Sequence, residues 1–372
     1  MAGLEYHSFE YETKKDNYQE YDNLDFNINV GEGRSLIKNS VRLVANIAVR
    51  DNAGANTGGI YLDHRAGAHA VIDSVQVAFT GGGMDNLIGT KENIQNYARL
   101  VVAHGVATKS PEDYLNASEV CELNGYDWKS SNLIAKGKAT RGTTPVASDM
   151  DFSIKPFCML NKMSGGDLPF MKSGNIRLSI NLATNRSALM GYLYNQAQDD
   201  YVITNPRVTF NSVPTPKNPT QSIFRSVYNV KNSVLSNFAS VNAKVPAVCD
   251  GCSIVFQQQV REQTAPYSNL DCEFPRGLEK VQFLFNDAVN DITYSIDDQT
   301  EMLQRFVDSF HDSGHNQVGG SRFGDNQSFG IGINFASAID LSNQKFNFQI
   351  TSKCDNANAY NEYLYFHSVT AI

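Results

Sequence analysis

Residues 71–82 read VIDSVQVAFTGG, and residues 278–287 read LEKVQFLFND. Both stretches contain an apolar residue, two polar residues, Val-Gln, two further residues and Phe, so the same predicted strand occurs twice. A chance match should not extend into the neighbouring sequence, whereas a duplicated fold repeats its elements in the same order. The flanking sequences therefore decide whether the chain contains an internal duplication.

Each stretch is followed by the pattern of a short amphipathic helix. In the first half Thr90 is suited to be the helix N-cap, and in the second half Asp298 and Glu301 resemble a capping box. The apolar residues recur at the spacing of one helical face. They are Ile94, Tyr97, Ala98, Val101 and Val102 in the first half, and Met302, Leu303, Phe306, Val307 and Phe310 in the second.

Three further pairs of segments follow in the same order in both halves. DFSIKPF at Asp151 matches SFGIGINF at Ser328, NIRLSINLAT at Asn175 matches KFNFQITSK at Lys345, and YVITNPRVTF at Tyr201 matches YLYFHSVTAI at Tyr363. The separation falls from 206 residues between Phe79 and Phe285 to 162 residues between Tyr201 and Tyr363. Longer loops in the first half explain this decrease, above all a loop over about residues 108–149. The preserved order indicates a duplication.

The predicted strands alternate apolar and polar residues, as IRLSINL and FNFQI do, which is typical of sheets with one buried face. Turns rich in Gly, Asn and Pro, with only one helix in each half, favour β-sandwiches over parallel α/β sheets. Residues 211–222 contain three prolines without periodicity, which predicts a stiff, extended connector. We predict an N-terminal arm over residues 1–24, a first unit over 25–217 and a second unit over 218–372.

The composition argues against several classes of protein. The 372 residues carry 31 Lys plus Arg and 39 Asp plus Glu, a formal charge of −8, without the basic block that binds nucleic-acid phosphates. No apolar run approaches the roughly 18 residues of a membrane span, and the first 23 residues lack the apolar core of a secretory signal. The scattered cysteines predict free thiols in a reducing compartment, so we expect a soluble intracellular product. They are Cys121, Cys158, Cys249, Cys252, Cys272 and Cys354.

Three local motifs suggest chemistry but lack the residues that this chemistry needs. Cys249 and Cys252 have the spacing of half a zinc site, but no second pair completes four ligands, so we interpret them as two thiols in a turn. His311 and His315 lie four residues apart with a glycine and no glutamate between them, which favours a solvated helix end. The glycine triplet at residues 81–83 lacks a following Lys-Ser or Lys-Thr, so it predicts a hairpin turn rather than a phosphate-binding loop.

Enzymes built on β-sandwiches leave signatures that this sequence does not contain. A metal-dependent cupin needs closely spaced histidines, but the seven histidines include no His-x-His, and His64 and His69 flank a predicted loop. No Gly-x-Ser-x-Gly elbow indicates a hydrolase. The sequons at Asn116 and Asn185 predict surface loops. We therefore predict a protein that is not an enzyme, with no catalytic, cofactor-binding or metal-binding residues and no cofactor.

The segment VIDSVQVAFTGGGMDNLIGTKENIQNYARL, residues 71–100, resembles the strand, Gly-Gly turn and helix of the first barrel in double jelly-roll major capsid proteins. This family occurs in tectiviruses, adenoviruses, virophages and large nucleocytoplasmic DNA viruses. FSIKPFCMLNKMSGGDLPFMKSGNIRLSINL at residues 152–182 resembles the next segment, and YVITNPRVTFNSV at residues 201–213 resembles the closing strand. The resemblance implies an all-β fold of two tandem eight-stranded jelly rolls, each with a short amphipathic helix.

The same resemblance implies a major capsid protein. In that family three copies form a trimer, and its six barrels make a pseudo-hexagonal block that tiles an icosahedral shell. The implied partners are other copies of the chain, minor capsid and penton proteins and an internal membrane, without direct sequence-specific binding of nucleic acid. The implied location is the virion, after synthesis and assembly inside the host cell.

An alternative is a tandem β-sandwich protein that binds a receptor or a glycan, as a viral spike does. A glycan pocket needs convergent aromatic residues, but the only tryptophan, Trp128, lies inside the long loop. The 17 tyrosines and 21 phenylalanines are spread along the predicted strands, as is typical of core and interface residues. A stable trimer that tiles into shells would favour the capsid protein, whereas a monomer that binds sugar saturably would favour the alternative.

Two segments have alternative predicted roles. The first 23 residues mix aromatic and charged side chains and are not expected to fold alone. They could dock as an arm on a neighbouring capsomer, a minor protein or the inner membrane face, or run along their own barrel as an extra edge strand. The loop over about residues 108–149 is predicted to decorate the outer surface, with burial in a subunit interface as the alternative. The aromatic residues of the N-terminal segment are Tyr6, Phe9, Tyr11, Tyr18 and Tyr21, and its basic residues are Lys14 and Lys15.

Overall fold

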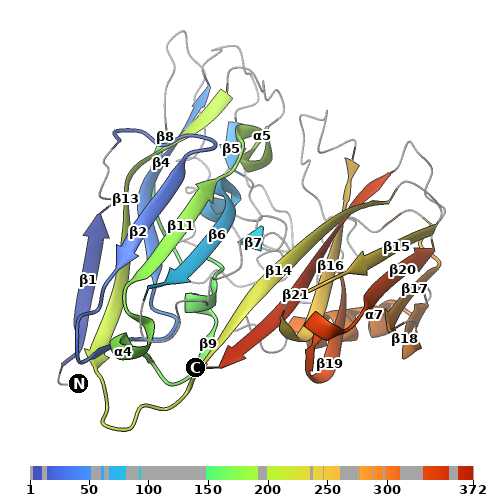
Figure 1. Ribbon diagram of the computed structural model, residues 1–372. Helices are drawn as coiled ribbons and strands as arrows, with labels where there is room; N and C mark the ends of the chain where they lie inside the picture. The colour runs from blue at the N-terminus through green and yellow to red at the C-terminus, as the bar shows by residue number, and fades with distance from the viewer. Residues whose placement is uncertain are drawn as a thin grey trace.

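The chain forms two β-sandwiches that lie side by side in the computed structural model (Figure 1). The structure describes residues 3–10, 15–51, 60–62, 67–80, 92–93, 148–191, 199–234, 238–245, 247–259, 275, 277–286, 288–295, 298–310, 330–351 and 359–371. Both termini and the connection between the two sandwiches lie at the same end of the molecule, which we call the base (Figure 1).

The first sandwich is built from two main sheets. One sheet contains β1 (Glu5–Glu10), β3 (Arg34–Leu36), β4 (Arg42–Asp51), β8 (Ser148–Ile154), β10 (Leu168–Pro169) and β13 (Asp199–Pro214). The other has the order β2 (Asn23–Ile28), β11 (Ile176–Leu182), β6 (Ile72–Phe79), β7 (Glu92–Asn93). A small separate sheet pairs β5 (Ile60–Leu62) with β12 (Leu189–Gly191), and the short helices are η1 (Gly67–Val71), η2 (Met159–Asn161), α4 (Phe170–Ser173) and α5 (Asn185–Ala188).

The second sandwich repeats this arrangement. One sheet has the order β19 (Gly330–Asp340), β16 (Val248–Gln258), β21 (Tyr360–Ala371), β14 (Ser222–Val234), β9 (Met163–Gly165). The facing sheet has the order β15 (Phe238–Ala243), β20 (Phe346–Thr351), β17 (Lys280–Phe285), β18 (Ala288–Ser295). The helices are α7 (Gln299–Phe310), which packs against β19 and β16, and η4 (Leu341–Asn343).

The duplication inferred from the sequence corresponds to equivalent strands in the two sandwiches. The matched segments lie on β6 and β17, β8 and β19, β11 and β20, and β13 and β21, and each pair holds the same position in its sheet. In each sandwich a four-stranded sheet faces a larger sheet, of six strands in the first sandwich and five in the second, which is the arrangement of a jelly roll with additional strands. The predicted all-β fold of two tandem jelly rolls is therefore confirmed.

The N-terminal segment is not a free arm over its whole length. Ser212 of β13 pairs with Glu5 of β1 on one side and with Leu36 of β3 on the other, so β1 and β3 flank β13. Strand β14 flanks β21 in the same way, opposite β16. Strand β1 is therefore the first barrel's counterpart of β14, and residues 5–10 follow the alternative of an edge strand on their own barrel.

The predicted helices have different outcomes. In the second half α7 starts after Asp298, whose Oδ1 accepts a hydrogen bond of 2.9 Å from the backbone N–H of Glu301, and Met302 and Phe306 are fully buried. In the first half the predicted first turn after Thr90 is wrong, because Glu92 and Asn93 form strand β7 along β6. The remainder of that predicted helix, residues 94–102, lies outside the described part of the chain.

The buried apolar side chains form one continuous set across both barrels. Along β11 the apolar residues Ile176, Leu178 and Ile180 are buried and Arg177 is exposed, as the alternation in the sequence predicts. Phe79 of the first barrel contacts Phe224 of the second, with 5.7 Å between ring centroids. The two sandwiches therefore share packing where they meet.

Candidate functional site

The pair Cys249 and Cys252 does not form the predicted turn. Both residues lie within β16, at an irregularity where the pairing register shifts, and both thiols are free and fully buried. Burial, with the charges of Asp250 and Asp340, raises the pKa of Cys249 to about 12, and burial also raises the pKa of Cys252 well above its usual value. Thiols that stay protonated are poor nucleophiles and poor metal ligands, so these residues act as small core side chains.

A buried serine–histidine contact lies on the outward side of β16 and β21. The Ser253 hydroxyl is 2.9 Å from His367 Nε2 and 3.1 Å from the Ser309 hydroxyl of α7. All three residues are buried. Burial, with the positive charges of Lys162 and Arg225, lowers the pKa of His367 to about 3. A base that no solvent reaches cannot serve an external substrate, so this contact fastens α7 to its sheet.

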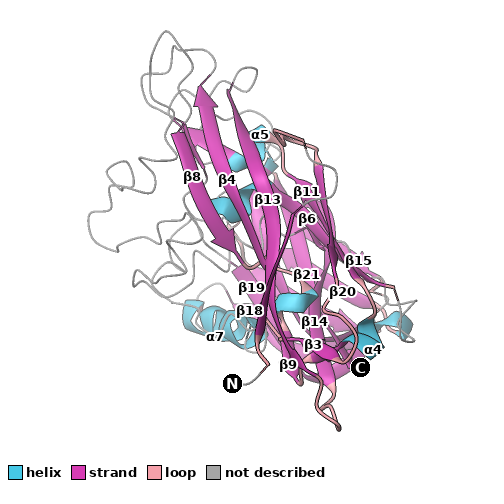
Figure 2. Cartoon of the chain, turned by 90° about the vertical axis from the view of Figure 1, so that its left-hand side faces the viewer, coloured by secondary structure: helices cyan, strands magenta, loops and turns pink. Residues whose placement is uncertain are grey.

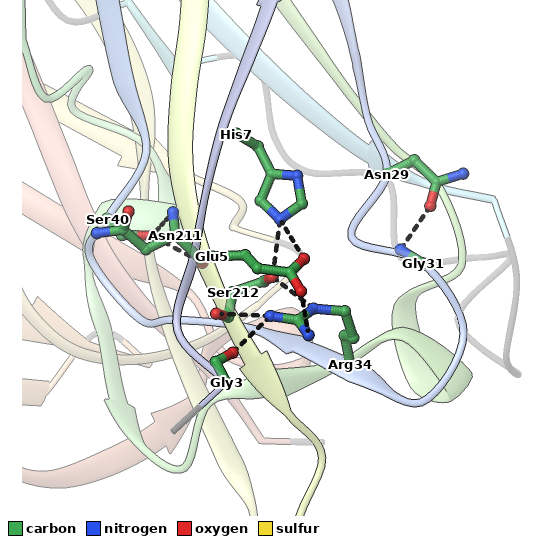
Figure 3. Close-up of polar contacts among 9 residues, drawn as sticks. All are labelled: Gly3, Glu5, His7, Asn29, Gly31, Arg34, Ser40, Asn211 and Ser212. Carbon is green, nitrogen blue, oxygen red and sulfur yellow. Dashed lines mark hydrogen bonds and ion pairs between the residues drawn. The ribbon is translucent and has the colours of Figure 1, made fainter. Parts of the chain in front are cut away.

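A second polar cluster closes the base end of the first barrel (Figure 3). Arg34 donates from Nε to the Ser212 hydroxyl (2.8 Å) and from Nη2 to the carbonyl oxygens of Gly3 (2.8 Å) and Ser212 (3.1 Å). Its Nη1 is 3.0 Å from the Glu5 carboxylate. His7 Nε2 lies 2.8 Å from the Ser212 hydroxyl. We call these residues the base latch, because they join β1 to β3 and β13.

The base latch has the residue types of a catalytic triad but not its geometry. In a triad the carboxylate holds one ring nitrogen of the histidine, and the serine contacts the other. Here the Ser212 hydroxyl at 2.8 Å and the Glu5 carboxylate at 3.9 Å approach the same atom, His7 Nε2. Ser212 is also fully buried, and its hydroxyl accepts from Arg34. The arrangement supports a structural role, which no local motif could reveal because Arg34 and Ser212 are 178 residues apart.

Removing the guanidinium of the base latch should release β1. Arg34→Ala removes an ion pair and three hydrogen bonds of a side chain that is 18% exposed. We expect about 2 kcal/mol loss in the free energy of unfolding and faster hydrogen exchange along residues 5–10. Arg177→Ala is the matched control, because its ion pair with Asp25 involves a side chain that is 61% exposed and should cost less than about 1 kcal/mol. Equal losses in both variants would contradict the role of the latch.

Several residues that the sequence singled out lie outside the described ranges, so their predictions remain untested. They are the glycine triplet at residues 81–83, His64, Asn116, Trp128, His311 and His315. His69 lies in η1, buried against the ring of Phe157 at 4.4 Å between centroids, and burial lowers its pKa to about 3. Asn185 begins α5, and its Oδ1 accepts a hydrogen bond from the backbone N–H of Tyr201.

In the part of the chain that the structure describes, no group of three potential metal ligands occurs. No helix in that part combines the length and hydropathy that crossing a bilayer requires.

Residues 158–168, which we call the strap, join the two barrels. On the first barrel Asn39 makes a reciprocal pair with Met163, in which the Asn39 Oδ1 accepts from the Met163 N–H (2.9 Å) and the Asn39 Nδ2 donates to the Met163 carbonyl (3.1 Å). The Lys38 ammonium donates to the Gly165 carbonyl at 2.9 Å. Asn39 has a φ of +58°, a backbone conformation that asparagine tolerates better than most residues. This first set of contacts holds the strap from one side.

The second barrel holds the strap from the other side. Strand β9 within the strap pairs with residues Ser222–Phe224 of β14, and the backbone N–H of Arg225 donates to the Lys162 carbonyl at 3.0 Å. The Arg225 guanidinium forms an ion pair of 2.5 Å with Asp250. A segment of the first barrel is therefore a strand of the second barrel's sheet, which fixes the angle between the barrels.

An open cleft of about 500 Å³ lies on the outer sheet of the first barrel, the face turned to the viewer in Figure 2. Residues of β4, β8 and β13 line it, beside the irregularity at Asn205, whose φ is +50°. The described lining residues are Val44, Ala45, Asn46, Asp151, Thr204, Asn205 and Arg207. The volume is in the range of small-molecule sites, but none of these residues is aromatic, so the cleft lacks the stacking surface that a glycan site needs.

Two jelly rolls in tandem, joined by a strap at a fixed angle, define the class of double jelly-roll proteins. No family model and no curated protein matches the sequence. The fold is similar to the Faustovirus major capsid protein, with a TM-score of 0.65, 8% identity and coverage of 100% of this chain and 90% of the other. It is also similar to the capsid of virus PBCV-1 (TM-score 0.60, 11% identity, 100% and 95% covered) and the mavirus major capsid protein (0.54, 10%, 98% and 86%). These similarities confirm the double jelly-roll fold over the whole chain.

Proposed function

We propose that the chain is the major structural subunit of an icosahedral virus capsid, in which three copies form a pseudo-hexagonal capsomer. The observation that carries the proposal is the strap. A capsid tile needs two barrels held at a fixed angle, and the strap holds them because its strand β9 pairs with β14 of the second barrel. The similarity to solved capsid proteins along the whole chain supports it. In this proposal the chain has no catalytic activity, and the boundary between the barrels lies near residue 217.

The partners and the location belong to the same proposal. Other copies of the chain form the capsomer and the shell, and minor capsid or penton proteins and an internal membrane complete the particle. The chain reaches the virion after synthesis and assembly in the host cell. The formal charge of −8 supports contacts with protein rather than with the genome.

The proposal predicts that the purified chain is a trimer. Native mass spectrometry in mild buffer should give three times the 41.1 kDa of one chain, and electron microscopy should show sheets or closed shells. Symmetric, closed association of this kind is usual for proteins that build containers from one subunit. A chain that stays strictly monomeric at high concentration would contradict the proposal.

The receptor- or glycan-binding alternative has weaker support. Its candidate surface is the cleft on the outer sheet of the first barrel, which has polar groups but no aromatic residue among those described there. Saturable binding of a sugar to a monomer would favour this alternative.

For the loop over about residues 108–149, first cleavage by a protease on intact particles would support an outer-surface position, and protection would support an interface.

A further inference from the structure

One carboxyl group lies inside the second barrel, where the described residues offer it no charged partner. Glu362 shares the inward face of β21 with Leu364 and Phe366, whose ring is 4.9 Å from the ring of Phe346 in the facing sheet. Glu362 is fully buried. Asn232 of β14 donates from Nδ2 to Oε2 at 3.3 Å, and Oε1 has no hydrogen-bond partner among the described residues. In that part of the chain, a single hydrogen bond from a neutral amide therefore holds the carboxyl group.

The described side chains that point into this interior beside Glu362 carry no charge. Phe256 of β16 pairs with Glu362 across the strands and contacts Phe348 of β20, with 6.5 Å between ring centroids. The neighbouring strands β15, β17 and β19 bury apolar residues: Val241, Val281, Phe283, Ile331 and Ile333. A carboxylate here would lose its hydration without gaining a counter-charge, so the neutral acid is favoured. Burial accordingly raises the pKa of Glu362 to about 7, and among the described residues only the hydrogen bond from Asn232 opposes this rise.

Strand β14, which supplies Asn232, is held on both sides only at the base. There β9 pairs with Ser222–Phe224, the backbone N–H of Arg225 donates to the strap, and the Arg225 guanidinium forms its ion pair with Asp250. Beyond Arg225, the only described strand that pairs with β14 is β21. We call residues 228–234 the outer half of β14, and its described side chains are partly buried or exposed. The outer half is therefore an edge that can separate from β21 while the base end stays in place.

Side-chain contacts on both faces of the sheet add to the backbone pairing of the outer half. On the outward face the Lys231 ammonium lies 5.0 Å from the centre of the Tyr363 ring, and on the inward face Asn232 bonds Glu362. Strand β14 lies on the side of the second barrel that faces the first (Figure 1), and it packs against η2 and β7 of the first barrel. A change in the outer half therefore also reaches the contact between the barrels.

We propose that Glu362 is a proton-dependent switch that holds the outer half of β14 against β21 when neutral and releases it when ionised. The carboxylate reaches water when the outer half separates, while β9 keeps the base end of β14 in its sheet. The open state releases the proton near the ordinary pKa of 4.5, and the closed state releases it near a pKa of about 7. Opening therefore increases as the pH rises between these two values and is constant above them. The inference concerns a single chain and does not depend on the proposed function.

Native-state hydrogen exchange of the full chain over a pH series tests the switch. After correction for the intrinsic pH dependence of exchange, the protection of residues 228–234 should fall about 50-fold between pH 5 and pH 8. Low concentrations of urea should hardly change this exchange, because a local opening exposes little surface. Residues 222–225 should stay more protected at every pH. Glu362→Gln should keep residues 228–234 protected throughout, and Glu279→Gln is the control for the loss of a carboxylate from the same barrel.

Two results would overturn the switch. Equal protection of residues 222–225 and 228–234 at every pH would show that β14 opens only when the whole barrel unfolds. An unchanged pH dependence in Glu362→Gln would assign the effect to another group. If this variant does not fold, the wild-type profile decides, because a loss of protection that continues above about pH 7 contradicts the role of Glu362. Either failure leaves the proposed function standing, since the measurement does not involve assembly.

Discussion

Replacing Gly165 by alanine should lower the free energy of unfolding by about 4 kcal/mol and loosen the attachment between the barrels. Gly165 has a φ of +75°, where a Cβ costs roughly 1–2 kcal/mol. The added Cβ would also lie 2.3 Å from the carbonyl oxygen of Gln221. Strand β9 must then move away from β14 and give up its pairing with Ser222–Phe224, and each lost hydrogen bond costs about 1 kcal/mol.

Gly33→Ala is the matched control for this prediction. Gly33 has nearly the same backbone conformation, with a φ of +73°, but nothing lies within 4 Å of an added Cβ. Only the strain of roughly 1–2 kcal/mol should remain. Urea unfolding of both variants measures the difference, and small-angle X-ray scattering should show a wider angle between the barrels only for Gly165→Ala. Equal losses would mean that the β9–β14 contact does not join the barrels.

The sequence predicts the parts of the fold that depend on local pattern. Equivalent strands of the two barrels, such as β6 and β17 or β11 and β20, could be matched because each half keeps its own alternation of buried and exposed residues. The N-cap at Asp298 was also predictable, since capping involves groups only three residues apart. Elements that repeat along the chain, and contacts between residues within one helical turn of each other, can therefore be predicted from the sequence.

Other features depend on contacts that no local pattern shows. The sequence left strand β1 as one of two alternatives because His7 and Glu5 occupy positions where a barrel strand usually carries apolar residues. Their partners Arg34 and Ser212 lie far away in the sequence. The reciprocal pair of Asn39 and Met163 spans 124 residues. The two cysteines in β16 were predicted to lie in a turn because no second pair completes a zinc site, but β19 and β21 pair with this segment on both sides.

Glu362 should make the second barrel less stable as the pH rises. Its carboxyl group is fully buried among core residues of β21, where Asn232 donates to Oε2 at 3.3 Å, and Oε1 has no hydrogen-bond partner among the residues that the structure describes. Burial raises its pKa to about 7, and the hydrogen bond from Asn232 only partly opposes this. The folded protein thus keeps the proton up to about pH 7, whereas the unfolded chain releases it near the ordinary value of 4.5. The contribution of neutral Glu362 to the free energy of unfolding is fully present below pH 4.5. It is lost as the pH rises to about 7, and the total loss is about 3 kcal/mol.

Glu362→Gln should remove this loss, because the amide stays neutral at every pH and its oxygen can still accept from Asn232. Urea unfolding should show equal stability of both chains near pH 4 and a variant more stable by about 3 kcal/mol at pH 8. Below pH 6.5 the buried His69 and His367, each with a pKa lowered to about 3, destabilise both chains equally, so the difference between the chains reports on Glu362. Glu279→Gln, an exposed change beside β17, is the control for the loss of a carboxylate from the same barrel. Parallel stability curves for wild type and Glu362→Gln between pH 4 and pH 8 would show instead that the carboxylate is ionised inside the folded barrel.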